Sequence, residues 1–220
     1  MAWRLDAAHP MVVAANRDEF HARPATPAAF WEDQPAILAG RDLEARGTWM
    51  GVSRGGKFCA VTNYRGAREP RAAESRGALV SRFLSNGDTA ADYMGAVQAK
   101  AQSYSGFNLL ACDGQELWWM SNRGGEPRRL DPGLYGLGNT LLDAPEVDEP
   151  KARFAAVAMA APATETLFGV LAASRIVNPL YGTRCATILL RGPDSLRYAE
   201  RSLGAEGEER DTVQFELRLA

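Results

Sequence analysis

The chain contains 220 residues, of which 46% are hydrophobic, and its 25 basic residues nearly balance its 27 acidic ones. This length suits one sizeable hydrophobic core, so we expect a single domain that spans residues 1–220. The balanced charge, without long runs of one sign, argues against nucleic acid as a partner.

Cysteine usage and hydropathy exclude further classes. Cys59, Cys112 and Cys185 are odd in number and far apart, and only two histidines accompany them. Such a set predicts neither a disulfide framework nor a zinc site, and it is typical of a reducing compartment. No apolar run reaches the roughly 18 to 20 residues that span a bilayer, and the N-terminus does not resemble a signal peptide. We therefore expect a cytoplasmic protein with no membrane span, no bound metal and no other cofactor.

Alternating and helical periodicities divide the chain into five blocks, in the order strands, two helices, strands, two helices, strands. Hairpins are indicated at Gly55-Gly56 and Asp113-Gly114, because such pairs favour tight turns. The predicted strands cover residues 11–16, 48–64 with its hairpin, 107–112, 116–121, 183–191, 196–203 and 212–220. The predicted helices cover residues 75–87, 88–104 with Asp88 as N-cap, 147–161 with Pro150 in its first turn, and 164–174.

This order of elements indicates the fold class. Paired helices and hairpins, without a rhythm of single-helix crossovers, favour α+β over a doubly wound parallel sheet. A four-layer αββα sandwich, with helices outside two central sheets, fits this order of strands and helix pairs.

Polar side chains recur where the apolar runs end, which is where a scaffold strand delivers side chains to a pocket. The candidates are Asn16, Arg17, Asp18, Glu19, Arg41, Asp42, Asn63, Arg65, Asn108, Asn139 and Arg184. Asparagine and arginine are not nucleophiles, but their N–H groups suit a carboxylate or a developing oxyanion. For any single position, a structural ion pair or a turn hydrogen bond is the more ordinary interpretation. As a group, they indicate a site for a small molecule.

Familiar catalytic motifs are absent from the sequence. It contains no G-x-S-x-G elbow, no phosphate-binding P-loop and no H-E-x-x-H metal site. Cys59 and Cys185 lie within apolar strand patterns, so we expect buried side chains and not activated thiols.

Six blocks of sequence carry a specific combination of motifs, above all "NRDEF" followed by "AGRD" and "GTWMGV". The blocks are "VVAANRDEFHARPATPAAFW", "ILAGRDLEARGTWMGVSRGGKFCAVTNYR", "SRGALVSRFL", "GFNLL", "GLGNTLLD" and "YGTRCATILL". In this order, and over nearly the whole chain, they resemble the NRDE-motif family, also called the transport and Golgi organisation protein 2 family. The family is grouped with the N-terminal nucleophile hydrolases, so the resemblance implies their αββα sandwich.

The resemblance also implies roles for the polar candidates. In N-terminal nucleophile hydrolases a first-residue Cys, Ser or Thr attacks an amide carbonyl, and its α-amino group, with a pKa of about 7.7 to 8.0, acts as base. By similarity the catalytic positions are Arg17, Asp18, Asn63, Asn139 and Arg184. The first two would hold and tune the nucleophile, the asparagines would donate to the oxyanion or substrate amide, and the last arginine would complete a charged wall. The further ligand-binding positions are Asn16, Glu19, Arg41 and Asn108.

The start of the chain departs from the family pattern. Family members typically begin with Met-Cys and several apolar residues before a segment like "AW", whereas this sequence begins "MAWRLDAAHP". Removal of Met1 would expose Ala2, whose methyl group is no nucleophile. Because a core strand is usually about five or six residues long, we expect an in-frame Met-Cys a few codons upstream. The alternative is that the protein has lost hydrolytic capacity.

Two functions remain open at this point. One is amide-bond hydrolysis. The other is binding or trafficking of an anionic small molecule without cleavage, with Arg17, Arg41 and Arg184 around the ligand. Haem and acyl-coenzyme A are the ligands that the family resemblance implies, although His9, His21 or a methionine would have to serve as the axial ligand of a haem.

Overall fold

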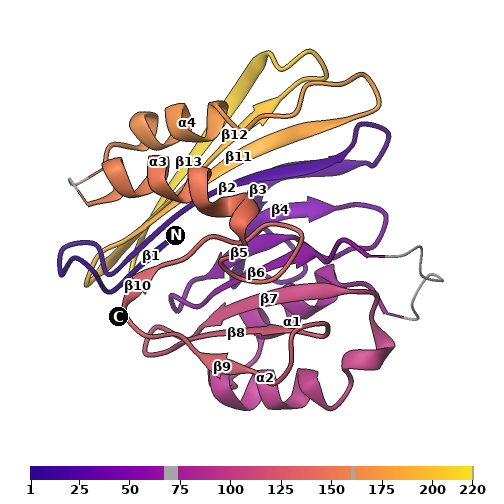
Figure 1. Ribbon diagram of the computed structural model, residues 1–220, viewed down its shortest axis with the longest axis vertical. Coiled ribbons are helices and arrows are strands. Elements are labelled where there is room, and N and C mark those ends of the chain that lie inside the picture. The colour runs from indigo at the N-terminus through magenta and orange to yellow at the C-terminus, as the bar shows by residue number, and fades with distance from the viewer. Residues whose placement is uncertain (67–73, 160–161, 220) are drawn as a thin grey trace. The chain divides into compact units, whose positions relative to one another are not determined.

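Two antiparallel β-sheets and, in the described residues, four α-helices make up the secondary structure (Figure 1). The computed structural model describes residues 1–66, 74–159 and 162–219. The α+β class predicted from the sequence is confirmed. Contacts within the chain define two units. Unit 1 consists of residues 1–27, 132–136 and 145–220, and unit 2 consists of residues 28–131 and 137–144.

Unit 1 is built on a six-stranded sheet in the order β10-β1-β2-β11-β12-β13. Its strands are β1 (Ala2–Trp3), β2 (Met11–Phe20), β10 (Gly133–Leu134), β11 (Tyr181–Arg191), β12 (Ser195–Leu203) and β13 (Glu209–Arg218). Its helices are α3 (Asp148–Ala158), preceded by a 3-10 turn at Pro145–Val147, and α4 (Thr164–Ala172). The predicted ends of the third helix at 160–161 and of the last strand at 220 lie outside the described residues.

The two helices of unit 1 cover one face of this sheet (Figure 1). Successive strand residues point to opposite faces, so every second side chain of β2 and β11 meets the helices. Val12 and Ile188 pack in this way against Phe154, Leu167 and Phe168 in one buried cluster. We call this side of the sheet the helix face, and the other side the opposite face.

Strand β2 extends beyond the predicted apolar run, which corrects the expectation that the strand ends at residue 16. It continues through the four polar residues to Phe20 and stays paired with β11, as far as Phe20 opposite Tyr181. The polar residues are tolerated because the pleat divides them between two faces and the ladder satisfies their backbone groups. The motif therefore lies within a strand and not in a loop after it.

The second sheet has seven strands in the order β3-β4-β5-β6-β7-β8-β9. They are β3 (Ala25–Phe30), β4 (Ile37–Asp42), β5 (Met50–Ser53), β6 (Phe58–Asn63), β7 (Phe107–Cys112), β8 (Leu117–Ser121) and β9 (Arg128–Arg129). The helices of unit 2 are α1 (Gly77–Ser85) and α2 (Ala90–Gln98), followed by a 3-10 turn at Ala101–Ser103. Both predicted hairpins are confirmed, and Gly56 and Gly114 have φ values of 83° and 100°, which glycine adopts without strain.

Helix α2 begins one residue later than predicted. The N-cap is Thr89 and not Asp88, because the Thr89 hydroxyl accepts a hydrogen bond from the backbone N–H of Asp92. The same hydroxyl donates to the Asp92 carboxylate at 2.8 Å. The backbone carbonyl of Asp88 instead accepts a hydrogen bond from Lys57 at 2.6 Å.

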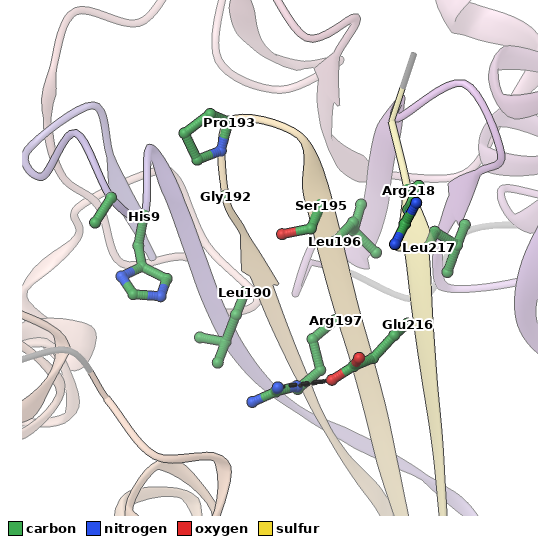
Figure 2. Close-up of a pocket in the computed structure, with 11 residues that line it drawn as sticks. His9, Leu190, Gly192, Pro193, Ser195, Leu196, Arg197, Glu216, Leu217 and Arg218 are labelled. Carbon is green, nitrogen blue, oxygen red and sulfur yellow. Dashed lines mark hydrogen bonds and ion pairs between the residues drawn. The ribbon is translucent and has the colours of Figure 1, made fainter.

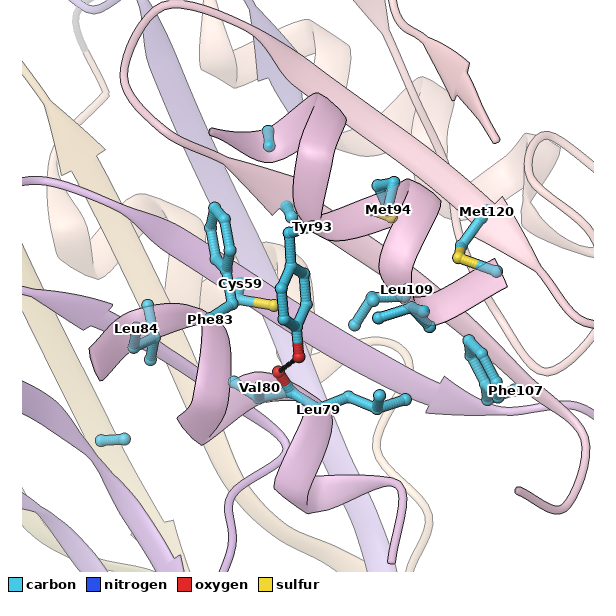
Figure 3. Packing of buried hydrophobic residues seen from close by; sticks show 14 of the residues in the cluster. Cys59, Leu79, Val80, Phe83, Leu84, Tyr93, Met94, Phe107, Leu109 and Met120 are labelled. Carbon is cyan, nitrogen blue, oxygen red and sulfur yellow. Dashed lines mark hydrogen bonds between the residues drawn. The ribbon is translucent and has the colours of Figure 1, made fainter. Parts of the chain in front are cut away.

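Helices α1 and α2 pack on one face of the second sheet (Figure 3). Leu79, Phe83 and Met94 from the helices meet Cys59 and Leu109 from the strands in one buried cluster. Within this cluster the Tyr93 hydroxyl donates a hydrogen bond to the backbone carbonyl of Leu79 at 2.6 Å, drawn as a dashed line in Figure 3. Each unit thus consists of a sheet with a pair of helices on one face.

None of the helices in the described part of the chain is both long enough and apolar enough to cross a membrane.

Candidate functional site

The four consecutive polar residues of β2 do not form one cluster, because the pleat separates them. Asn16 and Asp18 lie on the helix face with Val12, whereas Arg17 and Glu19 lie on the opposite face. Asn16 donates from Nδ2 to the carbonyl of Leu171 in α4 at 3.1 Å. The helix-face pair therefore has neighbours quite different from those of Arg17.

Asp18 anchors the segment that leads into β11. Thr183, its cross-strand neighbour, donates from Oγ1 to Asp18 Oδ1 at 2.6 Å. The same hydroxyl accepts the backbone N–H of Ile176 at 2.8 Å, and the Thr183 N–H donates to the Ile176 carbonyl at 2.9 Å. Burial raises the pKa of Asp18, and the hydrogen bond from Thr183 lowers it only in part. These contacts give Asp18 a structural role in unit 1.

Arg17 lies in a buried polar group on the opposite face. Its cross-strand neighbour is Cys185, and Thr187 and Glu200 follow on the same face of β11 and β12. Thr187 donates from Oγ1 to Glu200 Oε2 at 3.3 Å. Arg17 is 9% exposed and Glu200 only 1%. Ionisable side chains are rarely buried to this extent without electrostatic compensation, so this group is the strongest candidate site in unit 1.

The pKa of the Cys185 thiol depends on the charged groups around it. Burial raises the pKa of Cys185 well above its ordinary value, and the carboxylate of Glu200 raises it further. The guanidinium of Arg17 acts in the other direction and favours the thiolate. Arg17 is thus close enough to influence a thiol on this face, although Cys185 itself is inert because it is buried.

Glu19 and Arg184 are used mainly by the turn after β2. Glu19 accepts the backbone N–H of Phe20 at 2.8 Å. Arg184 occupies a bulge between Thr183 and Cys185 and donates from Nη1 to the carbonyls of Phe20, His21 and Arg23, at 2.9, 3.3 and 3.1 Å. Arg184 therefore holds the turn, which no sequence motif predicted.

Unit 2 brings three of the predicted asparagines together. Asn108 is fully buried and donates from Nδ2 to Thr62 Oγ1 at 3.1 Å and to the Thr140 carbonyl at 2.7 Å. Asn139 donates from its side chain to the backbone carbonyl of Asn63 at 2.9 Å. Segment 137–144 is thereby held against the ends of β6 and β7, and one N–H of the exposed Asn139 amide has no acceptor in the described part of the chain.

Arg41 is engaged elsewhere in unit 2. Its guanidinium makes a two-pronged ion pair with Asp33 at 2.5 and 2.6 Å and stacks on the ring of Trp31 at 4.2 Å. The hydrogen bond from Arg41 lowers the pKa of Asp33. The geometry is that of a structural pair and not of an open anion site.

The residues that sequence reasoning missed are Cys185, Thr187 and Glu200 as neighbours of Arg17, and Thr183 as the partner of Asp18. A glutamate at an inward position of an apolar strand is a recognisable signal, but the sequence does not reveal which position points inward. Among the described residues, no group of three or more His, Cys, Asp or Glu side chains is arranged to hold a metal ion.

Comparisons with known proteins give consistent matches. A family model described as Transport and Golgi organisation 2 matches residues 1–179. The Transport and Golgi organization protein 2 homolog of Bos taurus is 35% identical over 258 aligned residues, which cover 96% of this chain and 94% of that protein. The homolog of Mus musculus is 43% identical over 147 residues, covering 63% and 53%. The Drosophila melanogaster protein is 29% identical over 170 residues, covering 69% and 60%.

Proposed function

Because the chain belongs to the Transport and Golgi organisation 2 family, we propose that it is built as an amide-bond hydrolase of the N-terminal nucleophile type. The proposal includes the four-layer αββα sandwich that the family resemblance implies. Its support from the fold is that each unit supplies one sheet and one pair of helices on a single face of that sheet. The substrate class is a compound with an amide bond.

The observation that carries the proposal is the register of β1 on β2. Ala2 pairs with Val12 and Trp3 pairs with Met11, so the residue numbers in each antiparallel pair add up to 14. If the numbering continues backwards from Met1 as 0, −1, −2 and −3, the fourth residue before Met1 has the number −3. In the same register this residue would pair with residue 17, because −3 and 17 also add up to 14. A side chain at that position would lie directly opposite Arg17.

The same continuation also selects the face of the sheet. Directly paired residues of two antiparallel strands point to the same face, so a side chain opposite Arg17 would join the buried polar group on the opposite face. Met1 precedes β1 but already makes two backbone hydrogen bonds to Tyr135: its amino group donates to the Tyr135 carbonyl at 2.7 Å and its carbonyl accepts the Tyr135 N–H at 2.9 Å. We assign the nucleophile of the reaction to this position.

The chemistry follows from that placement. A first-residue thiol opposite Arg17 would lose its proton more readily, because a neighbouring guanidinium stabilises the thiolate. The α-amino group would accept the thiol proton, the thiolate would add to the amide carbonyl, and the α-ammonium group would pass that proton to the leaving amine as the carbon–nitrogen bond breaks. Water would then hydrolyse the acyl-enzyme.

We prefer hydrolysis to binding without cleavage because two of the three arginines required for binding have other partners. Arg41 is paired with Asp33, and Arg184 donates to three backbone carbonyls. Of the three, Arg17 is the one buried on the face where the nucleophile is assigned.

The test uses two extended forms of the chain that differ by one residue. In the first, an initiator Met, which the cell removes, is followed by Cys and three apolar residues before Met1. In the second, Cys and only two apolar residues precede Met1, which puts the thiol opposite Asn16 and on the helix face. We expect the first form to release p-nitroaniline from acyl p-nitroanilides and the second to be inactive. Equal rates for the two forms, or activity that survives Cys→Ala at the new first residue, would refute the proposal.

A further inference from the structure

A pocket of about 540 Å³ lies in unit 1 at the end of the β11–β12–β13 meander (Figure 2). Leu190, Arg197 and Glu216 are directly paired across the three strands and form one row of side chains on the helix face. Ser195 and Arg218 are paired in the next row. His9, from the connection between β1 and β2, lies on the other side of the pocket.

The charges in this pocket do not cancel. Arg197 donates from Nε and Nη2 to Glu216 Oε1 at 3.0 and 2.6 Å, so these two side chains neutralise each other. The guanidinium of Arg218 has no hydrogen-bond or ion-pair partner within residues 1–66, 74–159 and 162–219. Among the residues that line the pocket, two guanidinium groups therefore stand against one carboxylate, and the Asp6 carboxylate lies 3.4 Å from Nδ1 of His9.

Hydrogen-bond donors and apolar surface adjoin this charge. Neither the Ser195 hydroxyl nor Nη1 of Arg197 is used by another group in the described chain. Leu190 and Pro193 add apolar surface beside these donors. A volume of this size falls within the range of about 300 to 1,000 Å³ that small-molecule sites occupy.

We propose that this pocket binds a small organic anion that has a carboxylate head and a short apolar chain. The guanidinium of Arg218, the free edge of Arg197 and the Ser195 hydroxyl hold the carboxylate, because charge-assisted hydrogen bonds are the strong ones. The chain lies along Leu190 and Pro193 and loses contact with water there. This site is independent of the proposed hydrolase function and uses none of its residues.

Isothermal titration of the full chain with sodium hexanoate tests the proposal. Hexanol matches the apolar chain without the charge, and inorganic phosphate matches the charge without the chain. We expect saturable binding of hexanoate and much weaker binding of the other two. No saturable binding of hexanoate, or binding of phosphate as tight as that of hexanoate, would overturn the proposal.

Two matched variants of β13 locate the site. Arg218→Gln removes the unpaired charge at an exposed position, and we expect it to weaken hexanoate binding about tenfold, as the loss of a hydrogen bond to a charged group implies. Arg210→Gln removes an arginine of the same strand that is paired with Glu208 at 2.7 Å outside the pocket, and we expect the affinity to stay unchanged. Equal effects of the two substitutions, or none from Arg218→Gln, would show that hexanoate binds elsewhere.

Discussion

The two faces of β2 make different use of adjacent polar residues. On the helix face, Asn16 is bonded to a helix carbonyl and Asp18 to Thr183, so both side chains serve the internal structure of unit 1. On the opposite face, Arg17 lies among the buried side chains of Cys185 and Glu200. Neighbours in the sequence thus have separate roles, because the pleat of a strand sends them to separate environments.

The division of β2 between two faces separates residues that the sequence motif places side by side. Side-by-side Arg and Asp suggest a joint role in tuning one nucleophile. In the folded chain, Arg17 is on the face that the continued register of β1 selects, and Asp18 is on the other. We therefore expect substitutions on the helix face to alter stability, and substitutions of Arg17 to alter the reactivity of a thiol opposite it.

The largest effect on stability is expected from Thr183→Val. The substitution removes the donor to Asp18 and the acceptor for the Ile176 N–H at a position that is 2% exposed. Asp18 is only partly buried and Ile176 is exposed, so the loss of the two bonds should lower the free energy of unfolding by about 2 kcal/mol, measured by urea denaturation. Thr183→Ser keeps both bonds and should recover most of the loss.

The control for that experiment is Thr212→Val. Thr212 lies on exposed β13, where its hydroxyl accepts a hydrogen bond from Arg201 at 3.1 Å, and its substitution should change stability by less than about 0.5 kcal/mol. If the free energy of unfolding falls by the same amount in both valine variants, the hydrogen bond between Thr183 and Asp18 does not stabilise the fold more than an exposed surface bond does.

A smaller loss, of about 1 kcal/mol, is expected from Arg184→Ala. Three backbone carbonyls of the turn after β2 would exchange their guanidinium partner for water. Thermal unfolding measures this loss, and Arg210→Ala, which breaks an exposed ion pair, should cost less than about 0.5 kcal/mol. An unchanged melting temperature in Arg184→Ala would restore this arginine as a candidate for binding substrate.

The pH dependence of Asp18→Asn should be weaker still but has a definite sign. Burial raises the pKa of Asp18 in the folded state. Folding is therefore favoured while the carboxyl is protonated, and this contribution is lost as the pH rises from the unfolded pKa of about 3.9 through the folded one. Asparagine does not titrate, so the stability of the variant minus that of the wild type should increase with pH across this window.

Urea denaturation of both proteins at a series of pH values between about 3.5 and 7 measures this difference, in which the titration of all other groups cancels. A difference that falls as the pH rises would mean that the folded protein favours the charged form of Asp18. That result would make Asp18, like Arg17, a candidate for the reaction and not a purely structural residue.

The smallest effect is expected for the three native thiols, which should not react in the folded chain. Cys59, Cys112 and Cys185 are all free and buried, and burial raises the pKa of Cys59 and Cys185. Iodoacetamide at neutral pH should therefore label none of them in the folded chain and all of them in urea, as seen by mass spectrometry. Labelling of folded Cys185 would mean that solvent reaches the Cys185 thiol itself.

Periodicity and turn chemistry predicted much of this fold. Gly55-Gly56 and Asp113-Gly114 mark hairpins because their preferences are local, and the α+β order follows from the strands and helices between them. The extent of β2 was not predictable in this way. Asn16 to Glu19 have low strand propensity, and they are strand residues because β11 pairs with them over the whole length.

The candidate site was predicted as a set of residue types and not as an arrangement. Arg17 was identified, and the clustering of Asn63, Asn108 and Asn139 follows from segment 137–144 folding against β6 and β7. That Arg41 pairs with Asp33 and Arg184 with backbone carbonyls depends on contacts that no local pattern encodes. Glu200 joins Arg17 only through the pairing of β2, β11 and β12.

The central claim, that the register of β1 places a first-residue thiol beside Arg17, is tested most directly by the pKa of that thiol. It can be measured from the pH dependence of iodoacetamide alkylation in the chain extended by Cys and three apolar residues. We predict a pKa about one unit lower than in the same chain with Arg17→Met, with Arg17→Lys keeping most of the shift. An identical pKa with and without the Arg17→Met substitution, or an equal response when the extension is one residue shorter, would contradict the claim.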